Sequence, residues 1–337
     1  MYDNLVKTIL EEHEEALINP IYINSEPTNS GGLCNASLCY HNNRVHVILR
    51  SVQYTIHCCE GEEKLQSIYE GPVAYYHGDN DLTLRTTNYY CTLNPETLIL
   101  EHYTKIDTSK HDCLPLWCFI GLEDARIVNW DNKYYAIGVR RDTTTNGQGR
   151  MEFSELDISG TEVREINRTR IESSNPANYC EKNWMPIKNK PYHFVRWTNP
   201  VEIVKVDLEN KIAKVVYSNN KRFKLPYELR GGSQLVEWTN NTYLSIVHEC
   251  DFTQYNFNGY KNAAYYHRFV VWNKSLTINF ITESFNFMST KIEFCIGLEI
   301  VDNNVLITFG YQDNACYVLK LKKNTLNNIL WNKLKHV

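Results

Sequence analysis

The 337-residue sequence has no run of about 18 apolar residues, so no segment is long enough to cross a membrane as a helix. Its first twenty residues are acidic and amphipathic, and they lack the continuous apolar stretch of a secretory signal peptide. We therefore expect no membrane partner and a cytoplasmic location.

The sequence also lacks an excess of positive charge. Lys and Arg number 35 against 39 Asp and Glu, which gives a net charge of −4. Binding to a phosphate backbone relies on a basic surface, so a nucleic-acid partner is not expected. Neither G-x-G-x-x-G nor the P-loop pattern occurs, and a nucleotide-sugar donor therefore has no support in the sequence.

Cysteine is present, but without the spacing of a metal site. None of the eleven cysteines forms a C-x-x-C pair, and the closest are the neighbours Cys58–Cys59 and the wider pairs Cys34/Cys39 and Cys113/Cys118. Zinc sites need tighter paired spacings. We expect reduced, mostly packing thiols, no metal and no organic cofactor.

Helical patterns are few and confined to the two ends of the chain. Apolar residues recur at helical spacing over Tyr2–Leu17 and Thr325–Lys335. Hydrophobic residues make up 43% of the sequence, enough for a substantial core. Between the ends we predict short strands at Arg44–Leu49, Ala74–His77, Thr97–His102, Ala125–Trp130, Lys133–Arg140, Tyr192–Arg196, Glu202–Asp207, Gln234–Trp238, Thr242–His248, Tyr266–Trp272, Ile292–Ile300, Asn304–Phe309 and Ala315–Leu321.

One pattern recurs five times. It consists of a short motif, a strand, an Asn- or Asp-containing turn and a second strand that ends in polar residues. The clearest copies are GLEDARIVNWDNKYYAIGVRRD, RGGSQLVEWTNNTYLSIVHE and IEFCIGLEIVDNNVLITFGYQD, and looser ones are NASLCYHNNRVHVILRS and EKNWMPIKNKPYHFVRW. Repeated antiparallel units favour an all-β fold, a five-bladed β-propeller with short N- and C-terminal helices, over the alternative of a Greek-key sandwich. The predicted divisions are a helical lead-in over 1–30, the propeller over 31–322 and a C-terminal helix over 323–337.

Polar residues stand at the same ends of these units, and in a propeller such positions converge on one end of the axis. Cations and carboxylates gathered there suit an anionic group together with a hydroxylated substrate. The residues concerned are Asp124, Arg126, Arg140, Arg141, Lys182, Asn183, Arg230, His248 and Asp313.

Several of these segments resemble the inverting mannoside phosphorylases of glycoside hydrolase family 130, which are five-bladed propellers. GLEDARI (Gly121–Ile127) is similar to the family's G-x-E-D-P-R-I motif, with Ala125 in place of Pro. EKNWMP, the IVHE strand and FGYQDNA resemble further family elements in the same order, with Glu249 where the family has Gly. RGGSQ and EKNWMP are closest to a divergent branch found in bacteria and large viruses. The resemblance covers about Asn35 to Leu321.

The resemblance implies roles for individual residues. Asp124 would be the general acid that protonates the glycosidic oxygen, while inorganic phosphate, as co-substrate, attacks the sugar from the other face. An Arg next to this Asp would oppose acid function by lowering its pKa, unless burial offsets the effect. The substrate, an oligosaccharide or sugar phosphate, would contact Glu123, Arg126, Asn183, Trp184, Tyr311 and Asp313. Phosphate would contact Arg50, Arg140, Arg141, Lys182, Arg230 and His248.

Two other functions fit the same sequence. A hydrolase would need a second carboxylate to activate water, for which Glu249, Glu299 and Asp313 are the candidates. A non-catalytic propeller that binds a glycan or a protein would need neither the cations nor that carboxylate. The terminal helices could cap a blade or form a homo-oligomer contact.

Overall fold

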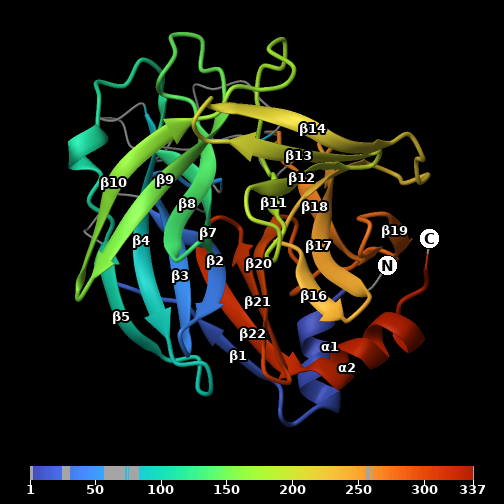
Figure 1. The fold of residues 1–337 in the computed structure, drawn as a ribbon. Helices are drawn as coiled ribbons and strands as arrows, with labels where there is room; N and C mark the ends of the chain where they lie inside the picture. Colours follow the sequence, from blue (N-terminus) through green and yellow to red (C-terminus); the bar gives the residue numbers. More distant parts are fainter. Residues whose placement is uncertain are drawn as a thin grey trace.

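Five β-sheets stand around one axis in the computed structural model, which describes residues 3–24, 31–56, 73, 75, 83–255, 259 and 261–336 (Figure 1). Neighbouring strands within each sheet follow one another in the chain, with the exceptions given below. The predicted all-β, five-bladed propeller with short terminal helices is confirmed. Two sequence features, the pair Cys58–Cys59 and, apart from Tyr75, the strand predicted at Ala74–His77, lie outside the described residues.

The sheets are numbered as blades in chain order. Blade 1 contains β2 (Gly32–His41), β3 (Arg44–Val52), β4 (Leu84–Leu93) and β5 (Leu100–Lys105), with β6 (Phe119–Ile120) parallel to β4. Blade 2 contains β7 (Leu122–Trp130), β8 (Lys133–Arg140), β9 (Arg150–Ser159) and β10 (Glu162–Arg170). Blade 3 contains β11 (Met185–Pro186), β12 (His193–Thr198), β13 (Val201–Asp207) and β14 (Ile212–Asn219).

In blade 4 the inner strand is divided into two short strands, and in blade 5 the outermost strand comes from the N-terminal part of the chain. In blade 4, β15 (Glu228–Gly231) and β16 (Val236–Thr239) both pair with β17 (Thr242–Asp251), which is followed by β18 (Ala264–Asn273) and β19 (Ile278–Ile281). Blade 5 contains β20 (Glu293–Val301), β21 (Asn304–Tyr311) and β22 (Ala315–Lys322), and its outermost strand is β1 (Leu17–Pro20). Leu17 of β1 pairs with Lys320 of β22, so the start of the chain closes the ring.

The five repeated segments of the sequence form the first two strands of the five blades. These strands are the most apolar and the most deeply buried. In β17, for example, every residue after Thr242 is buried. The inner position explains the repeat, because both faces of such a strand pack against neighbouring blades and tolerate little variation in pattern.

The terminal helices are shorter than the sequence pattern predicts. Helix α1 spans Leu5–Glu12 and begins at Asn4, whose side chain accepts a hydrogen bond from the Lys7 backbone. The sequence pattern predicts a helix that extends to Leu17, but α1 ends at Glu12. Leu17 belongs instead to β1, where it pairs with β22. Helix α2 spans Lys323–Asn328 and continues as a turn of π-helix over Ile329–Lys333.

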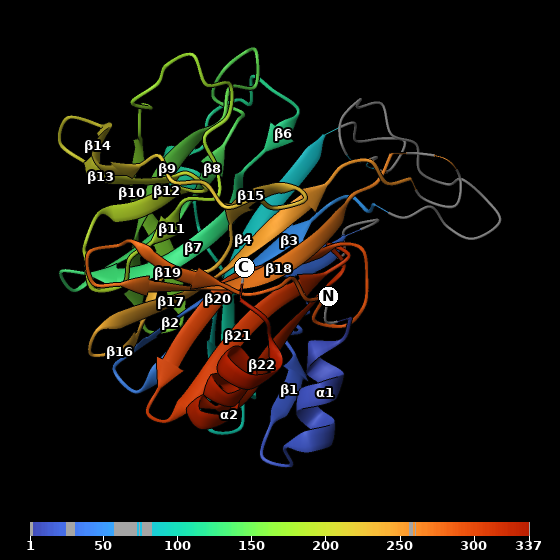
Figure 2. The same cartoon turned by 90° about the vertical axis from the view of Figure 1, so that its right-hand side faces the viewer.

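Both helices pack against the propeller rather than standing away from it. They lie next to each other beside blades 4 and 5 (Figures 1 and 2). Leu5 and Ile9 of α1 share one buried cluster with Leu326 and Leu330 at the other end of the chain, together with Trp238 of blade 4. The apolar faces that the sequence pattern gives to these two helices therefore pack against each other and against the propeller of the same chain.

Candidate functional site

Left-handed backbone conformations bring polar side chains to one end of the axis. Asn35 in β2 and Asp124 in β7 have φ of 48° and 50°, and each lies where the register with the next strand shifts. Asn183, just before β11, has φ of 61°. Asn and Asp are the side chains that tolerate this conformation best, and such bulges redirect a side chain out of the regular alternation. All three residues line a common cavity.

Asp313 reaches the same cavity from blade 5. It lies in the turn between β21 and β22 with φ of 52°, directly after Gln312, which is also left-handed. Gly32 permits this placement, because a β-carbon at that position would lie 2.2 Å from the Asp313 carbonyl oxygen. The full lining of this cavity, called the axial cavity below, is Asn35, Arg50, Tyr54, Ile56, Val73, Tyr75, Glu123, Asp124, Lys182, Asn183, Arg230, His248, Tyr265, Ile292, Phe294 and Asp313.

The Asp124 carboxylate is held by an ion pair. Its Oδ1 accepts hydrogen bonds from Arg50 Nη1 at 2.8 Å and from Asn35 Nδ2 at 2.9 Å. Only 6% of Asp124 is exposed. Burial raises the pKa of Asp124, but Arg50, the Asn35 hydrogen bond and nearby Lys182 outweigh it, so the pKa lies below its ordinary value. The carboxyl group is therefore ionised at neutral pH.

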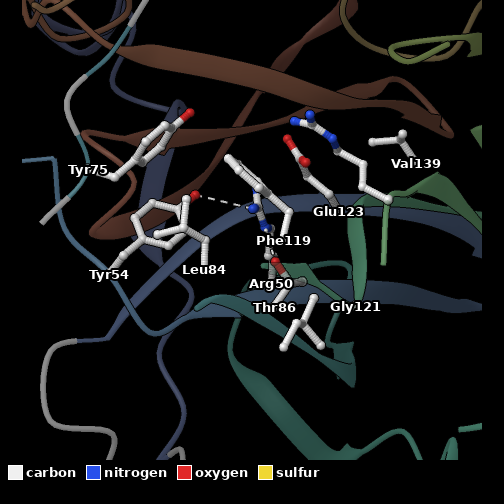
Figure 3. A pocket seen from close by; sticks show the side chains of 11 residues that line it. Arg50, Tyr54, Tyr75, Leu84, Thr86, Phe119, Gly121, Glu123 and Val139 are labelled. Atoms are coloured by element: carbon white, nitrogen blue, oxygen red, sulfur yellow. Dashed lines mark hydrogen bonds between the residues drawn. The ribbon is translucent and has the colours of Figure 1, made fainter. Parts of the chain in front are cut away.

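The environment of Asp313 is different. Its Oδ2 accepts one hydrogen bond, from the Tyr54 hydroxyl at 3.3 Å, and that hydroxyl in turn accepts from Arg50 Nη2 at 3.2 Å. Figure 3 shows the Tyr54 hydroxyl facing the Arg50 guanidinium. Burial raises the pKa of Asp313, Arg50 lowers it, and the carboxylates of Asp124 and Glu123 raise it further, so it lies above its ordinary value.

Three basic side chains also line the axial cavity. Lys182 makes no ion pair with any described residue, and Arg230 pairs with Glu228 at 3.1 Å while lying over the Phe252 ring. His248 is buried, and within the described part of the chain its Nδ1 has no hydrogen-bond partner. Burial, followed by His267 and Arg230, lowers the pKa of His248 well below its ordinary value, so the ring is neutral.

Glu123 connects the axial cavity to a smaller one beside it. The second cavity is also lined by Arg50, Tyr75, Phe119 and Arg141 (Figure 3). Arg141 lies over the Phe119 ring at 4.4 Å and donates to the hydroxyl of Tyr179. Arg141 thus lines the second cavity together with Glu123 and is not among the residues that line the axial cavity.

Four predicted site residues do not line either cavity. Arg126 is buried and donates to the Gly232 carbonyl at 2.8 Å, so it links blade 2 to blade 4. Trp184 is a core residue that packs on Phe194. Arg140 is buried in an ion pair with Glu152 at 2.5 Å, which leaves it unavailable to phosphate. Tyr311 ends β21 and packs near the ring of Tyr317, away from the cavity.

Arg50 lines the axial cavity and holds Asp124 there. Its guanidinium donates to Asp124, Tyr54 and Thr86, which uses three of its five N–H groups. Arg50 therefore lowers the pKa of Asp124 more than the adjacent Arg126 does. Burial does not offset its effect.

Two of the three carboxylates considered for water activation lie elsewhere. Glu249 pairs with Arg268 at 2.7 Å and does not line the axial cavity. Glu299 pairs with Lys188 at 2.6 Å in a separate cavity near the far ends of the inner strands. Among these candidates, only Asp313 shares a cavity with Asp124.

The sequence analysis missed several lining residues. Tyr54 completes the hydrogen-bond chain that runs from Asp124 through Arg50 to Asp313, and Asn35 donates to Asp124 at the start of that chain. Tyr265 and Phe294 form the apolar wall on which the His248 ring packs. Asn35 occupies the same position in the first repeat copy as Asp124 does in the second. That correspondence could have identified Asn35 as a residue of the cavity. No sequence pattern marked the others.

These observations define a class of protein, a five-bladed β-propeller with a charged cavity at one end of its axis. No protein-family model matches the sequence, and no curated protein matches it. Among solved structures, the chain is similar to a β-1,2-mannobiose phosphorylase from Listeria innocua in complex with β-1,2-mannobiose. The identity is 12%, the coverage 93% of this chain and 96% of that one, and the TM-score 0.55.

A second similar structure is a glycosyl hydrolase from Bacteroides ovatus. Here the identity is 13%, the coverage 87% of this chain and 84% of the other, and the TM-score 0.51. At these identities the likeness establishes the fold. The resemblance that GLEDARI and the other motifs indicated is thereby confirmed at the level of fold. In the described part of the chain no helix is long and apolar enough to cross a membrane.

Proposed function

We propose that the protein is a carbohydrate-active enzyme that acts on a glycosidic bond with phosphate as co-substrate, in the manner of an inverting mannoside phosphorylase. The observation that carries this proposal is the composition of the axial cavity. Its lining combines carboxylates from blades 2 and 5 with Lys182, Arg230 and His248 from blades 3 and 4. The shared fold with a mannobiose phosphorylase supports the same conclusion.

The proposed role of each lining residue follows from its charge. Lys182 and Arg230 provide charge-assisted donors for a phosphate oxygen, and the unpaired Nδ1 of His248 offers a further contact. Phosphate is an adequate nucleophile, so the site needs only to hold it in line with the sugar. The carboxylates and Asn183 suit sugar hydroxyls. The ionised Asp124 would also stabilise the positive charge that develops on the sugar ring in the transition state.

The first experiment is a phosphate-release assay. The protein is mixed with sugar 1-phosphates and acceptor sugars, with Asp124→Asn alongside and Asp302→Asn as a matched control. Asp302 is an exposed residue in the turn between β20 and β21, at the other end of the same blade from Asp313. We expect acceptor-dependent release that Asp302→Asn retains and Asp124→Asn loses by at least about 100-fold.

One observation favours hydrolysis as the second candidate. An ionised Asp124 and a less acidic Asp313 in one cavity resemble the base and acid of an inverting glycosidase. Cleavage of a disaccharide that does not depend on added phosphate would establish hydrolysis and reject the phosphorylase. Glycan binding without turnover in either assay would reject both in favour of a non-catalytic propeller.

A further inference from the structure

Asp142 holds the start of the strand that carries the Glu-Asp pair of the GLEDARI motif. Its Oδ2 accepts a hydrogen bond at 2.8 Å from the backbone N–H of Gly121, the first residue of that motif. Asp142 lies just after β8 and is 7% exposed. On its other side Gly121 packs closely on β4, because a β-carbon there would lie 2.3 Å from the Thr86 carbonyl oxygen. The start of β7 is therefore held between blade 1 and Asp142.

A chain of charged side chains crosses blade 2 and ends at Asp142. Arg140 Nη1 lies 3.4 Å from Asp142 Oδ2, and Arg140 Nε donates to Glu152 at 2.5 Å. Arg168 Nε lies 3.6 Å from the same Glu152 oxygen, and Arg168 Nη2 pairs with Glu165 at 2.5 Å. The two arginines and the two glutamates come from β8, β9 and β10, and both glutamates are buried. Three strands of blade 2 thus hold the Asp142 carboxylate in place.

Glu123 depends on this arrangement. Its carboxylate lines both cavities, and among the described residues it has no hydrogen bond and no ion pair (Figure 3). The position of the carboxylate is therefore set by its backbone, which pairs with Val139 of β8. The register with β8 shifts directly after Glu123, so the support on the other side comes from the hydrogen bond at Gly121.

Two further hydrogen bonds connect this segment to its surroundings. Asn88 Nδ2 of β4 donates to the Leu122 carbonyl at 2.8 Å. The backbone carbonyl of Asp142 accepts from the Leu116 N–H at 2.8 Å, in the segment that leads to Phe119 of the second cavity. Asp142 therefore fixes two segments that line the second cavity, one with its side chain and one with its backbone.

We propose that Asp142 is a positioning residue, which holds Glu123 where its carboxylate accepts hydrogen bonds from hydroxyl groups of the sugar. This inference rests on the proposed function. A carboxylate without a partner in the fold has its lone pairs available to hydroxyl donors. Its benefit to turnover depends on geometry, because a displacement of about 1 Å can reduce a rate by about 100-fold.

The first test does not require activity. Amide hydrogen exchange is followed by mass spectrometry in peptides that cover Phe119–Asp124, in wild type, Asp142→Ala and Asp142→Asn. Asn retains an oxygen for the Gly121 N–H, and its amide nitrogen takes the place of Asp142 Oδ1, which has no hydrogen-bond partner in the described part of the chain. We expect exchange about tenfold faster in Asp142→Ala and near wild type in Asp142→Asn. Unchanged exchange in Asp142→Ala would overturn the proposal.

The second test separates the sugar from phosphate. Turnover is measured with the sugar 1-phosphate and acceptor that give the fastest phosphate release, starting with mannose 1-phosphate and mannose. Binding of inorganic phosphate is measured by calorimetry. We expect Asp142→Ala to lose about 10- to 100-fold in kcat/KM for the acceptor and Asp142→Asn to retain most of it, while both bind phosphate within about twofold of wild type. Equal losses in sugar and phosphate, or an Asn variant as poor as the Ala variant, would overturn the positioning role.

Glu165→Gln is the matched control. It weakens the other end of the same chain of charges, in β10, and leaves the Gly121 hydrogen bond in place. We expect a lower urea midpoint with kcat/KM within about twofold of wild type. A loss of kcat/KM as large as that of Asp142→Ala would show that activity follows the stability of blade 2 and would reject the proposal.

A further variant covers the case in which Asp142→Ala fails to fold. Asn88→Ala removes the hydrogen bond to the Leu122 carbonyl and should lower kcat/KM a few-fold, again without changing phosphate binding. An unchanged kcat/KM would count against backbone support as the determinant of Glu123. A silent phosphate-release panel with the expected exchange pattern would reject the proposed function and the sugar contact with it, while the hold of Asp142 on β7 would stand.

Discussion

The two ends of the propeller axis hold charged residues in different ways. The inner strands all run in one direction, so the axial cavity gathers residues near their starts, such as Asn35 and Asp124. The separate cavity that contains Glu299 gathers residues near their ends, including Cys39 and Trp130. At this far end Glu299 pairs with Lys188 at 2.6 Å and also accepts from the backbone N–H of Tyr40 and Ile300.

The two ends differ in how many of their charged side chains have an ion-pair or hydrogen-bond partner. At the far end, the buried carboxylate has a cation and two backbone donors. In the axial cavity Lys182 has no ion-pair partner among the described residues, and His248 Nδ1 has no hydrogen-bond partner there. His248 is buried and Lys182 is partly exposed, and an anion bound beside both would supply the partner that each lacks. Residue type alone would not have separated Lys182 from Lys188.

The largest expected effect is on folding stability, when the ion pairs at the two ends of the propeller axis are broken. Arg50→Met leaves the buried Asp124 without its cation and should destabilise the fold by about 3–5 kcal/mol. Lys188→Met, at the far end, should cost about 1 kcal/mol or less, because Lys188 is 34% exposed and Glu299 keeps two backbone donors. Urea unfolding of both variants gives the comparison, and equal losses would contradict it.

A smaller loss of folding stability is expected on substitution of Glu181, the residue that precedes Lys182 and Asn183. Glu181 accepts hydrogen bonds from Arg196, Ser173, Asn178 and Trp184, so Glu181→Gln should cost about 2–3 kcal/mol at neutral pH. Burial raises the pKa of Glu181, but these hydrogen bonds outweigh it and the pKa is lowered.

The sign of the pH dependence follows from that lowered pKa. The contribution of Glu181 is full above the pKa of the unfolded chain and is lost as pH falls through the lower, folded value. Urea midpoints of wild type and Glu181→Gln should therefore converge in acid. A constant difference from pH 7 to pH 3 would show that the effect is not ionic.

Phosphate affinity should distinguish the two cations that line the axial cavity, Lys182 and Arg230, from Lys188 at the far end. Lys182→Met and Arg230→Met should each weaken binding of inorganic phosphate by about tenfold or more, equivalent to about 1.4 kcal/mol. Lys188→Met should leave it unchanged. Calorimetric titration with phosphate measures all three, and equal affinities would remove the basis for the anion site.

The smallest expected effect is a proton taken up with phosphate. His248 is neutral in the free protein because burial and neighbouring cations lower its pKa. A phosphate beside it would raise that pKa, so binding should strengthen a few-fold as pH falls toward 6. Calorimetry in two buffers of different ionisation enthalpy detects the uptake. His248→Asn should abolish it, and uptake in that variant would assign the proton to another group.

The sequence predicted the blades better than it predicted the site. The repeat located the two inner strands of every blade, because burial on both faces constrains them. It missed β4, β9, β10 and β14, whose outward faces carry polar residues and blur the alternation. It also placed Leu17 in a helix, since a four-residue strand completed by β22 has no pattern of its own.

For the site, position along the repeat located Asp124, Lys182, Arg230, His248 and Asp313 in one cavity. It did not separate the residues that line the cavity from those that face the core. Arg126 lies two residues from Asp124, yet the bulge at Asp124 directs its side chain to Gly232 of blade 4. The partner of Asp124 came from another blade, and such pairings depend on tertiary packing that no local spacing records.

The closure of blade 5 by β1 has a consequence for how the molecule assembles. Pairing between β1 and β22 joins segments near opposite ends of the chain, which is among the slowest kinds of contact to form. The turn that carries Asp313 belongs to this blade, whereas Asp124 belongs to blade 2. The two carboxylates can therefore meet only when the ring has closed, so a partly folded chain would carry every residue of the site but no assembled site.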